Sequence, residues 1–205
     1  MREPCSRPRR FGLFVSIALL TCLPLMAQGA KSQTRSIKQI FEEDQQDRVN
    51  FMKLSSDDLQ KMTLHDASRR EEVRQLLAAG LMQTGEDYKK ASFIFQHGNG
   101  PEDYLLAHVL AVAAIAKLDA SAIWISAATL DRYLQSVKQP QVFGTQYNLK
   151  DITAVPRVVT QEPYDKNTVS DELRRAFCVT PYAGQQENVN ALNQGKEMAQ
   201  ADGCR

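Results

Sequence analysis

The fold of this chain is decided by the stretch from residue 101 to residue 136, which reads PEDYLLAHVLAVAAIAKLDASAIWISAATLDRYLQS. Pro101 suits the first turn of a helix, where a missing N–H loses no partner. No charged residue occurs from Tyr104 to Ala116, so this helix is predicted to be apolar all round and buried. Asp119 is a helix N-cap residue and predicts a second helix packed against the first. Its expected core stripe consists of Ala120, Ile123, Trp124, Ala127, Leu130 and Leu134.

Amphipathic helices are also predicted before this stretch. Thr84 and Asp87 have the spacing of a capping box and open a helix that ends near Gly98. Ser55, with Asp58 three residues later, opens an earlier helix that ends at Gly80. Apolar residues at helical spacing predict a further helix between residues 37 and 52.

The character of the sequence changes after residue 136. Residues 139–147 contain Pro and Gly without helical periodicity, which predicts a long ordered loop. Residues 155–159 are compatible with one short strand, and Ser170 opens a helix through Phe177. No second copy of the 84–136 pattern occurs, which argues against a solenoid. The predicted fold is all-α: a compact helical bundle with a repeat-like pair of central helical hairpins, a long irregular loop and at most one short β element.

The first 29 residues have the organisation of a secretory signal. Four arginines precede an uncharged run from Phe11 to Leu23, and Ala27-Gln28-Gly29 provides the small residues of a cleavage site. The run is shorter than the ~20 residues of a membrane-spanning helix, which favours cleavage over anchoring. Lipidation of Cys22 is a further alternative. We expect a signal peptide at 1–29, a single helical domain at 30–182 and a tail at 183–205, in a protein exported to the periplasm or secreted.

Charge and motifs exclude several classes of function. Loss of the signal removes four arginines and one glutamate and leaves 21 basic and 23 acidic residues, a formal charge of −2. Such a balance predicts neither nucleic acid nor a membrane surface as a partner of the mature chain. No metal-ligand cluster, phosphate loop, nucleophile elbow or dinucleotide fingerprint occurs, so no metal and no cofactor is predicted.

Two cysteines remain after removal of the signal. In an oxidising compartment, Cys178 and Cys204 are expected to form one disulfide that tethers the C-terminal tail. A closed loop of that size stabilises a protein by roughly 3 kcal/mol in the chain-entropy model. Two free thiols or a metal pair are the alternatives, and no histidine lies near either cysteine in the sequence.

Asp131 is a candidate for a buried charged site. Its position on the apolar stripe directs its carboxylate to the core, where it requires a partner. If the two helices form an antiparallel hairpin that turns near residue 118, His108 and Asp131 lie at similar heights along it. The carboxylate could form a structural hydrogen bond with His108, pair with Arg48, Arg69 or Arg70, or orient His108 as a catalytic acid or base.

Polar residues beside the bundle form a second set of candidates. His97 could cap the end of its helix together with Gly98, or act as an acid or base at the mouth of a cleft, positioned by Gln96. The residues predicted to bind a polar ligand are Gln96, Arg132, Gln141, Gly144, Thr145 and Gln146. The amides and hydroxyl of the loop could equally tie the loop onto the bundle.

These residues also occur together in a known pattern. Asp87-Tyr88, Gln96-His97-Gly98, a helix with His108, Asp131-Arg132 and Gln141-x-Phe143-Gly144-Thr145-Gln146 resemble an uncharacterised, mainly bacterial domain-of-unknown-function family over residues 40–182. Arg69-Arg70 and the segment 171–175 fit its flanks. Phe143 stands where Tyr is common in that family, which preserves an aromatic role but not a hydroxyl one. The resemblance implies a shared helical fold and marks these positions as a candidate site, without implying a reaction.

Two functions follow from these residues, and whether the protein is an enzyme stays open. In the first, an exported helical domain binds a polar ligand or a protein partner through the cleft edge near Gln96, His97 and the 139–147 loop. In the alternative, a hydrolase-like enzyme uses His97 or His108 as acid or base with Asp131 as orienting group, and Gln141, Thr145 or Gln146 polarises the substrate. A purely structural role is the third interpretation.

Overall fold

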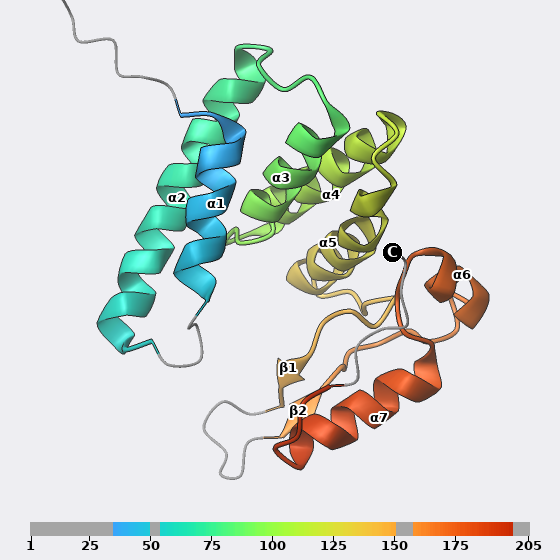
Figure 1. The fold of residues 1–205 in the computed structure, drawn as a ribbon. Helices are drawn as coiled ribbons and strands as arrows, with labels where there is room; N and C mark the ends of the chain where they lie inside the picture. Colours follow the sequence, from blue (N-terminus) through green and yellow to red (C-terminus); the bar gives the residue numbers. More distant parts are fainter. Residues whose placement is uncertain (1–34, 50–53, 151–157, 199–205) are drawn as a thin grey trace, which may run out of the picture. The chain divides into compact units, whose positions relative to one another are not determined.

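Figure 1 shows a computed structural model of the protein, which describes residues 35–49, 54–150 and 158–198. Seven α-helices, one short 3-10 helix and two short strands occur in these residues. In chain order they are α1 (Ile37–Arg48), α2 (Ser56–Ala78), α3 (Gly85–Phe95), α4 (Pro101–Ala116), η2 (Ala120–Ala122), α5 (Ile123–Ser136), β1 (Asn148–Leu149), β2 (Val159–Thr160), α6 (Asp171–Ala176) and α7 (Tyr182–Asn193). The predicted all-α bundle with a minor β element is confirmed.

Local signals set the starts of several helices, as predicted. The Ser55 hydroxyl accepts the N–H of Asp58 at the start of α2, and the Thr84–Asp87 capping box opens α3. Pro101 occupies the first turn of α4, and Ser170 caps α6. A capping box at the start of α1, formed by Ser36 and Gln39, was not predicted.

Three boundaries differ from the prediction. Helix α3 ends at Phe95, so His97 lies after it. Asp119 caps η2, and α5 begins only at Ile123. Helix α7, Tyr182–Asn193, lies in the region that was expected to be a C-terminal tail, and its Gln185 side chain is fully buried. The packed part of the chain therefore extends past residue 182.

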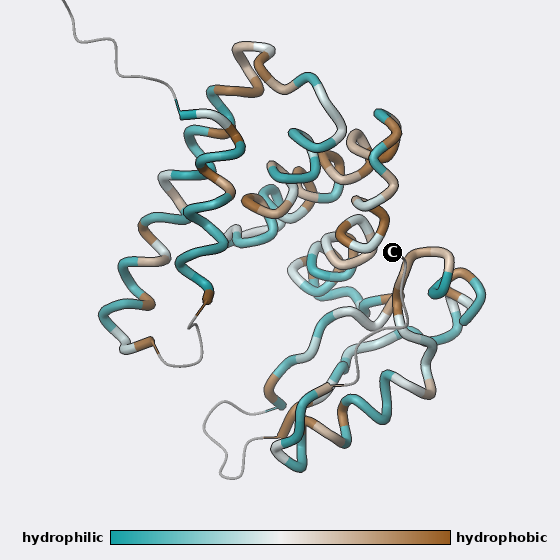
Figure 2. Tube along the Cα trace, in the orientation of Figure 1, coloured by the Kyte–Doolittle hydropathy of each residue, from teal (hydrophilic) through white to brown (hydrophobic). Residues whose placement is uncertain are grey.

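Helix α4 lies at the centre of the packing between helices. Helix α4 packs on α3 and on α5, while α1 contacts both α2 and α3 (Figure 1). One apolar cluster joins residues of α1 to α4, and a second joins α4, η2 and α5. In Figure 2, hydrophilic and hydrophobic residues alternate along α1 and α2, as expected of helices with one buried face.

Two predictions about burial are wrong. Helix α4 is not buried all round, because Val109 on it is 53% exposed. Trp124, predicted to lie in the core, is 42% exposed, and its neighbour Ile125 is buried instead. The prediction assumed one continuous helix from Ala120. The buried face of α5 is set by its packing instead, because Ile125 and Ala128 contact the α4 cluster and Ala127 contacts Phe143 of the following loop.

The loop after α5 joins the C-terminal segments to the bundle. Ala127 of α5 packs in one cluster with Phe143, Val169 and Val179. Strands β1 and β2 pair antiparallel, with Leu149 opposite Val159. Part of the strand predicted at 155–159 lies outside the described residues, as do the predicted signal, Cys22 and Cys204.

All described residues belong to one unit, Thr34–Arg205. Among them, no helix combines the length and the apolar character needed to cross a bilayer.

Candidate functional site

A buried charged network connects α1, α2 and the turn after α3. Asp44 follows Ile37 and Ile40 on the same stripe of α1, so the helix carries its carboxylate into the core, where it is fully buried. On α2, Asp66 and Arg69 precede Val73 at helical spacing and are also buried. Burial of these charges requires that they be paired.

Ion pairs link these side chains directly. Arg48 Nη1 donates to Asp44 Oδ1 at 2.8 Å, and its Nη2 donates to Asp66 Oδ2 at 2.8 Å. Arg69 Nη1 donates to the other oxygen of Asp66 at 3.1 Å. We call Asp44, Arg48, Asp66, Arg69 and His97 the Asp44 network. Arg48 of α1 pairs with Asp66 of α2, and Arg69 of α2 also pairs with Asp47 of α1, so these ion pairs fix α1 against α2.

His97 completes this network through both ring nitrogens. Arg48 Nε donates to Nε2 of His97 at 3.1 Å, and Nδ1 lies 3.2 Å from Asp44 Oδ1. An arginine can only donate, so Nε2 accepts and Nδ1 carries the proton that faces Asp44. The interpretation of His97 as a cap for the carbonyls of α3 is therefore wrong. Its backbone carbonyl instead accepts Arg70 Nη1 at 2.7 Å.

Two pockets flank the Asp44 network. A pocket of about 440 Å³ is lined by Arg48, Met62, Asp66, His97 and Gly98. We call it the His97 pocket. Its three charged or titratable side chains are each less than one-fifth exposed, at 19%, 9% and 18% for Arg48, Asp66 and His97.

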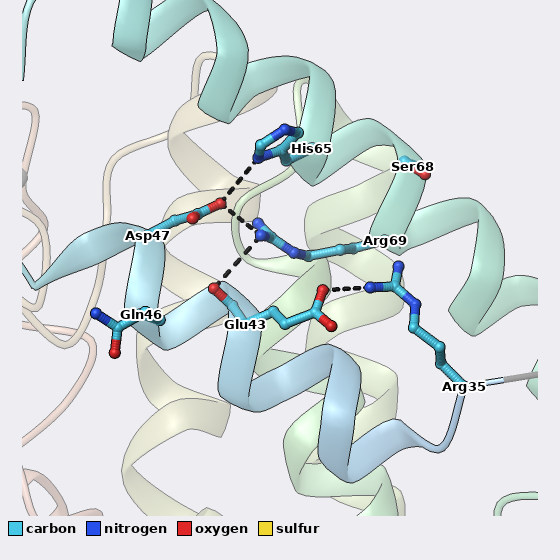
Figure 3. A pocket seen from close by; sticks show the side chains of 7 residues that line it. All are labelled: Arg35, Glu43, Gln46, Asp47, His65, Ser68 and Arg69. Carbon is cyan, nitrogen blue, oxygen red and sulfur yellow. Dashed lines mark hydrogen bonds and ion pairs between the residues drawn. The ribbon is translucent and has the colours of Figure 1, made fainter.

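The second pocket, of about 360 Å³, lies between α1 and α2 (Figure 3). Asp47 points toward both His65 and Arg69, and Arg35 pairs with Glu43 (Figure 3). Burial acts to raise the pKa of Asp47, but the hydrogen bonds from Arg69 and His65 outweigh it and hold that pKa below its ordinary value. Its lining charges pair with one another, as those of the His97 pocket do.

The predicted contact between His108 and Asp131 is wrong. His108 Nδ1 lies 2.9 Å from the backbone carbonyl oxygen of Ser126, so this nitrogen donates to α5. Asp131 is fully buried and receives the backbone N–H groups of Val142 and Phe143 at 2.8 and 2.9 Å. The prediction matched the heights of the two residues along the helices but not their directions around the helix axes.

Asp131 also does not pair with Arg48, Arg69 or Arg70, as the other structural interpretation had it. The backbone N–H and the hydroxyl of Thr145 fill the remaining acceptor positions of its carboxylate, at 2.9 and 2.7 Å. Arg48 and Arg69 bind Asp66, and Arg70 binds Asp103. The buried charge is therefore compensated by loop amides.

The predicted ligand-binding loop is held by its own polar groups. The Gln141 side chain is fully buried, accepts the Gln146 N–H at 2.9 Å, and donates to the carbonyls of Gln146 and Gln161. Gln146 Nε2 donates to Ala128 of α5 at 3.1 Å. These bonds match the structural alternative, in which the amides tie the loop onto the bundle.

Gly144 and Thr145 take part in the same arrangement. Gly144 has a φ of +82°, and a Cβ there would lie 2.6 Å from the hydroxyl of Tyr164 and would overlap the Gln185 side chain. Only glycine fits this backbone conformation and this close approach. The hydroxyl of Thr145 is occupied by Asp131.

Gln96 and Arg132 lie in different surroundings. Gln96 is the half-buried C-cap residue of α3, next to His97. Arg132 stacks over the ring of Tyr104 at 5.8 Å, and its buried Nε has no hydrogen-bond partner among the residues that the structure describes. Burial lowers the pKa of Arg132, and Tyr104 only partly opposes this. Tyr104 in turn donates to the carbonyl of Gly98 at 2.8 Å, which connects Arg132 to the turn that lines the His97 pocket.

The structure thus separates residues that the sequence analysis grouped. His97 joins Asp44 and Arg48, His108 binds α5, and Asp131 binds the loop. Asp44 and Asp66 were missed as members of the site. The signal that identified Asp131, a carboxylate on an apolar stripe, applies equally to Asp44 after Ile37 and Ile40. In residues 35–49, 54–150 and 158–198, no group of three or more His, Cys, Asp or Glu is arranged to hold a metal ion.

The chain matches no protein-family model, no curated protein and no solved structure. The site is therefore interpreted from its own geometry.

Proposed function

We propose that this protein is an exported helical binding protein that holds a small polar ligand in the His97 pocket. The observation that carries the proposal is the convergence of Arg48, Asp66 and His97, from three segments of the chain, on one pocket of about 440 Å³. That volume lies within the range of small-molecule sites. Each of the three side chains is held by ion pairs or hydrogen bonds, so the polar groups are preorganised for a ligand.

The residues that line the His97 pocket indicate which class of small molecule it would bind. Arg48 and Asp66 pair with each other, so their charges balance at the pocket wall. Met62 adds an apolar surface, and His97 adds hydrogen-bonding capacity. A small molecule with both donors and acceptors and a short apolar part suits this wall better than a polyanion does. The proposal keeps the predicted role of His97 but moves the site from the 139–147 loop to the side formed by α1 and α2.

A pocket-filling variant tests this proposal. We expect Met62→Trp to fill the His97 pocket, while Ser68→Trp, also on α2, fills the neighbouring pocket and acts as the matched control. The measurement is the NMR shift of the Gly98 amide on titration with a panel of free amino acids, monosaccharides and dipeptides. Wild type and Ser68→Trp should respond to at least one probe, and Met62→Trp should respond to none. A silent Gly98 amide in wild type, or an unchanged response in Met62→Trp, would contradict the proposal.

A hydrolase-like enzyme is the second candidate. One observation favours it: Asp44 lies against Nδ1 of His97 at 3.2 Å, the position of a carboxylate that orients a catalytic imidazole. Asp44 would replace the predicted Asp131 in this role. However, Nε2 is occupied by Arg48, so the ring acts as a base only if Arg48 moves. Hydrolysis of p-nitrophenyl acetate should then be lost in His97→Gln, whereas equal rates in the variant and wild type would remove this candidate.

We also propose export with cleavage after the signal, and a disulfide between Cys178 and Cys204. Cys178 and Cys204 are the two cysteines that remain after removal of the signal, and an oxidising compartment favours their pairing; Cys204 lies outside the described residues. N-terminal sequencing of the protein from an exporting host should begin at residue 30 or 31. Thiol titration under denaturing conditions should find no free thiol, and two titratable thiols would contradict the disulfide.

A further inference from the structure

One face of α4 is apolar and exposed. Its exposed large residues are Leu105, Val109 and Val112, at 42%, 53% and 47%. They belong to the uncharged run from Tyr104 to Ala116 that the sequence analysis predicted to be buried. Single exposed apolar residues are ordinary, but three on one face of one helix form a continuous surface.

The spacing of this face is that of a helix-pairing seam. The other sides of α4 pack on α3 and α5, so this exposed face, which we call the seam, is the side of α4 without a packing partner among the described residues. Successive exposed residues are separated by three, four, three and four positions, the alternation of a coiled-coil interface. They are Glu102, Leu105, Val109, Val112 and Ala116.

We infer that this seam pairs with the same seam of a second copy of the chain, the two α4 helices running antiparallel about a two-fold axis at Val109. With the axis there, Leu105 of one copy faces Val112 of the other, and Val109 faces its own counterpart. The stripe is therefore self-complementary, as a two-fold symmetric interface requires. This inference goes beyond the proposed ligand binding and does not depend on it.

The charges at the two ends of the seam select the antiparallel direction. Glu102 begins the seam, and Lys117 follows its last residue; both are exposed. The described residues provide no ion pair for either side chain, although the Lys117 ammonium lies 5.6 Å from the ring centre of Tyr88. In the antiparallel arrangement Glu102 of each copy lies beside Lys117 of the other. A parallel pair would place like charges together at both ends, which disfavours it.

The size of the seam predicts a dimer that dissociates on dilution. At 1.5 Å per residue, the 16 residues of α4 extend about 24 Å, so one helix pair forms an interface at the small end of the range for specific complexes. A second copy at high concentration would remove the exposed stripe from water.

The first test follows molar mass against concentration by light scattering, with the protein purified from an exporting host. Wild type should change from dimer to monomer on dilution. Val109→Glu places two carboxylates at the two-fold axis and should be monomeric throughout. Leu64→Glu, at a 65% exposed leucine of α2, is the matched control and should dimerise as wild type does. A wild type that is monomeric at every concentration, or a dimeric Val109→Glu, overturns the inference.

The second test distinguishes antiparallel pairing from other modes of association. Glu102→Lys and Lys117→Glu each create like-charge contacts and should raise the dissociation constant about tenfold, and more at low salt. The double variant restores opposite charges and should return the constant to near the wild-type value. Both substitutions are at exposed residues, so circular dichroism should show unchanged helix content in all three variants. Failure of the double variant to recover dimerisation overturns the antiparallel arrangement.

Discussion

At the scale of single residues, the Asp131 carboxylate stands out because one side chain holds the start of the loop after α5. Its two oxygens accept three backbone N–H groups, from Val142, Phe143 and Thr145, and one hydroxyl. A carboxylate has about four acceptor positions, so these four donors occupy all of them. The loop conformation therefore depends on this one residue.

A double-mutant cycle tests this assignment. Asp131→Ala leaves four donors without a partner, and we expect the free energy of unfolding to fall by roughly 3 kcal/mol or more. His108→Ala removes a hydrogen bond to Ser126 and should cost about 1 kcal/mol. Because the two side chains share no interaction, the double variant should equal the sum of the singles in urea unfolding. A coupling energy above about 1 kcal/mol would show that they do interact.

At the scale of the elements, carboxylates at helix starts make the fold sensitive to acid. Asp87 accepts the backbone N–H groups of Gln83 and Thr84 at the start of α3. Burial acts to raise the pKa of Asp87, but hydrogen bonds from Thr84 and Gln83 outweigh it and hold that pKa below its ordinary value of 3.8. A depressed folded-state pKa contributes stability above pH 3.8 that is lost as the pH falls through the folded value.

Asp87→Asn tests this contribution. We expect the variant to be about 1 kcal/mol less stable than wild type at pH 6, the usual cost of a weakened cap. The difference should shrink as the pH falls through the lowered folded-state pKa of Asp87, because the wild-type carboxylate then becomes protonated as well. Urea unfolding at pH 6 and at a series of lower pH values measures it. Glu187→Gln, exposed on α7, is the control and should show no such change. A difference that is constant with pH would contradict the assignment.

At the scale of the whole molecule, polar side chains join the C-terminal segments to the loop after α5. Arg174 is 2% exposed and donates to the carbonyls of Phe143 and Val142, each at 3.3 Å. Gln185 Nε2 donates to the same Phe143 carbonyl at 2.8 Å. Gly144 follows Phe143 directly. Because it has no side chain, Gln185 of α7 can approach the loop closely at this point.

A matched pair of glycine variants measures this junction. Gly144 and Gly195 have φ values of +82° and +70°, but they differ in the space around them. A Cβ at Gly144 would meet Gln185 and Tyr164, whereas a Cβ at Gly195 would have no atom within 4 Å. Gly195→Ala should cost about 1–2 kcal/mol for the left-handed backbone alone. Gly144→Ala should cost at least about 2 kcal/mol more, because Gln185 and Tyr164 must move. Equal losses of thermal stability in the two variants would show that the close approach does not matter.

The helices were predictable because their signals are local. Caps such as Ser55, Thr84 and Ser170, and Pro101 at the start of α4, act within one turn of the chain, so reading along the sequence locates them. The phase of α5 was not predictable in this way. It depends on how α5 packs against α4 and against the loop that follows it, which are contacts between distant parts of the chain.

The sequence by itself determined the helical class, the starts of most helices, the burial of Asp131 and the choice of His97 as a candidate site residue. Only the tertiary structure decided their partners: Asp44 and Arg48 for His97, and the loop amides for Asp131. It also decided that one face of α4 stays exposed. The physical reason is that capping and periodicity act between neighbours in the chain. The direction of a side chain around its helix, and the group that it then meets across 11 to 53 residues, depend on how whole helices pack.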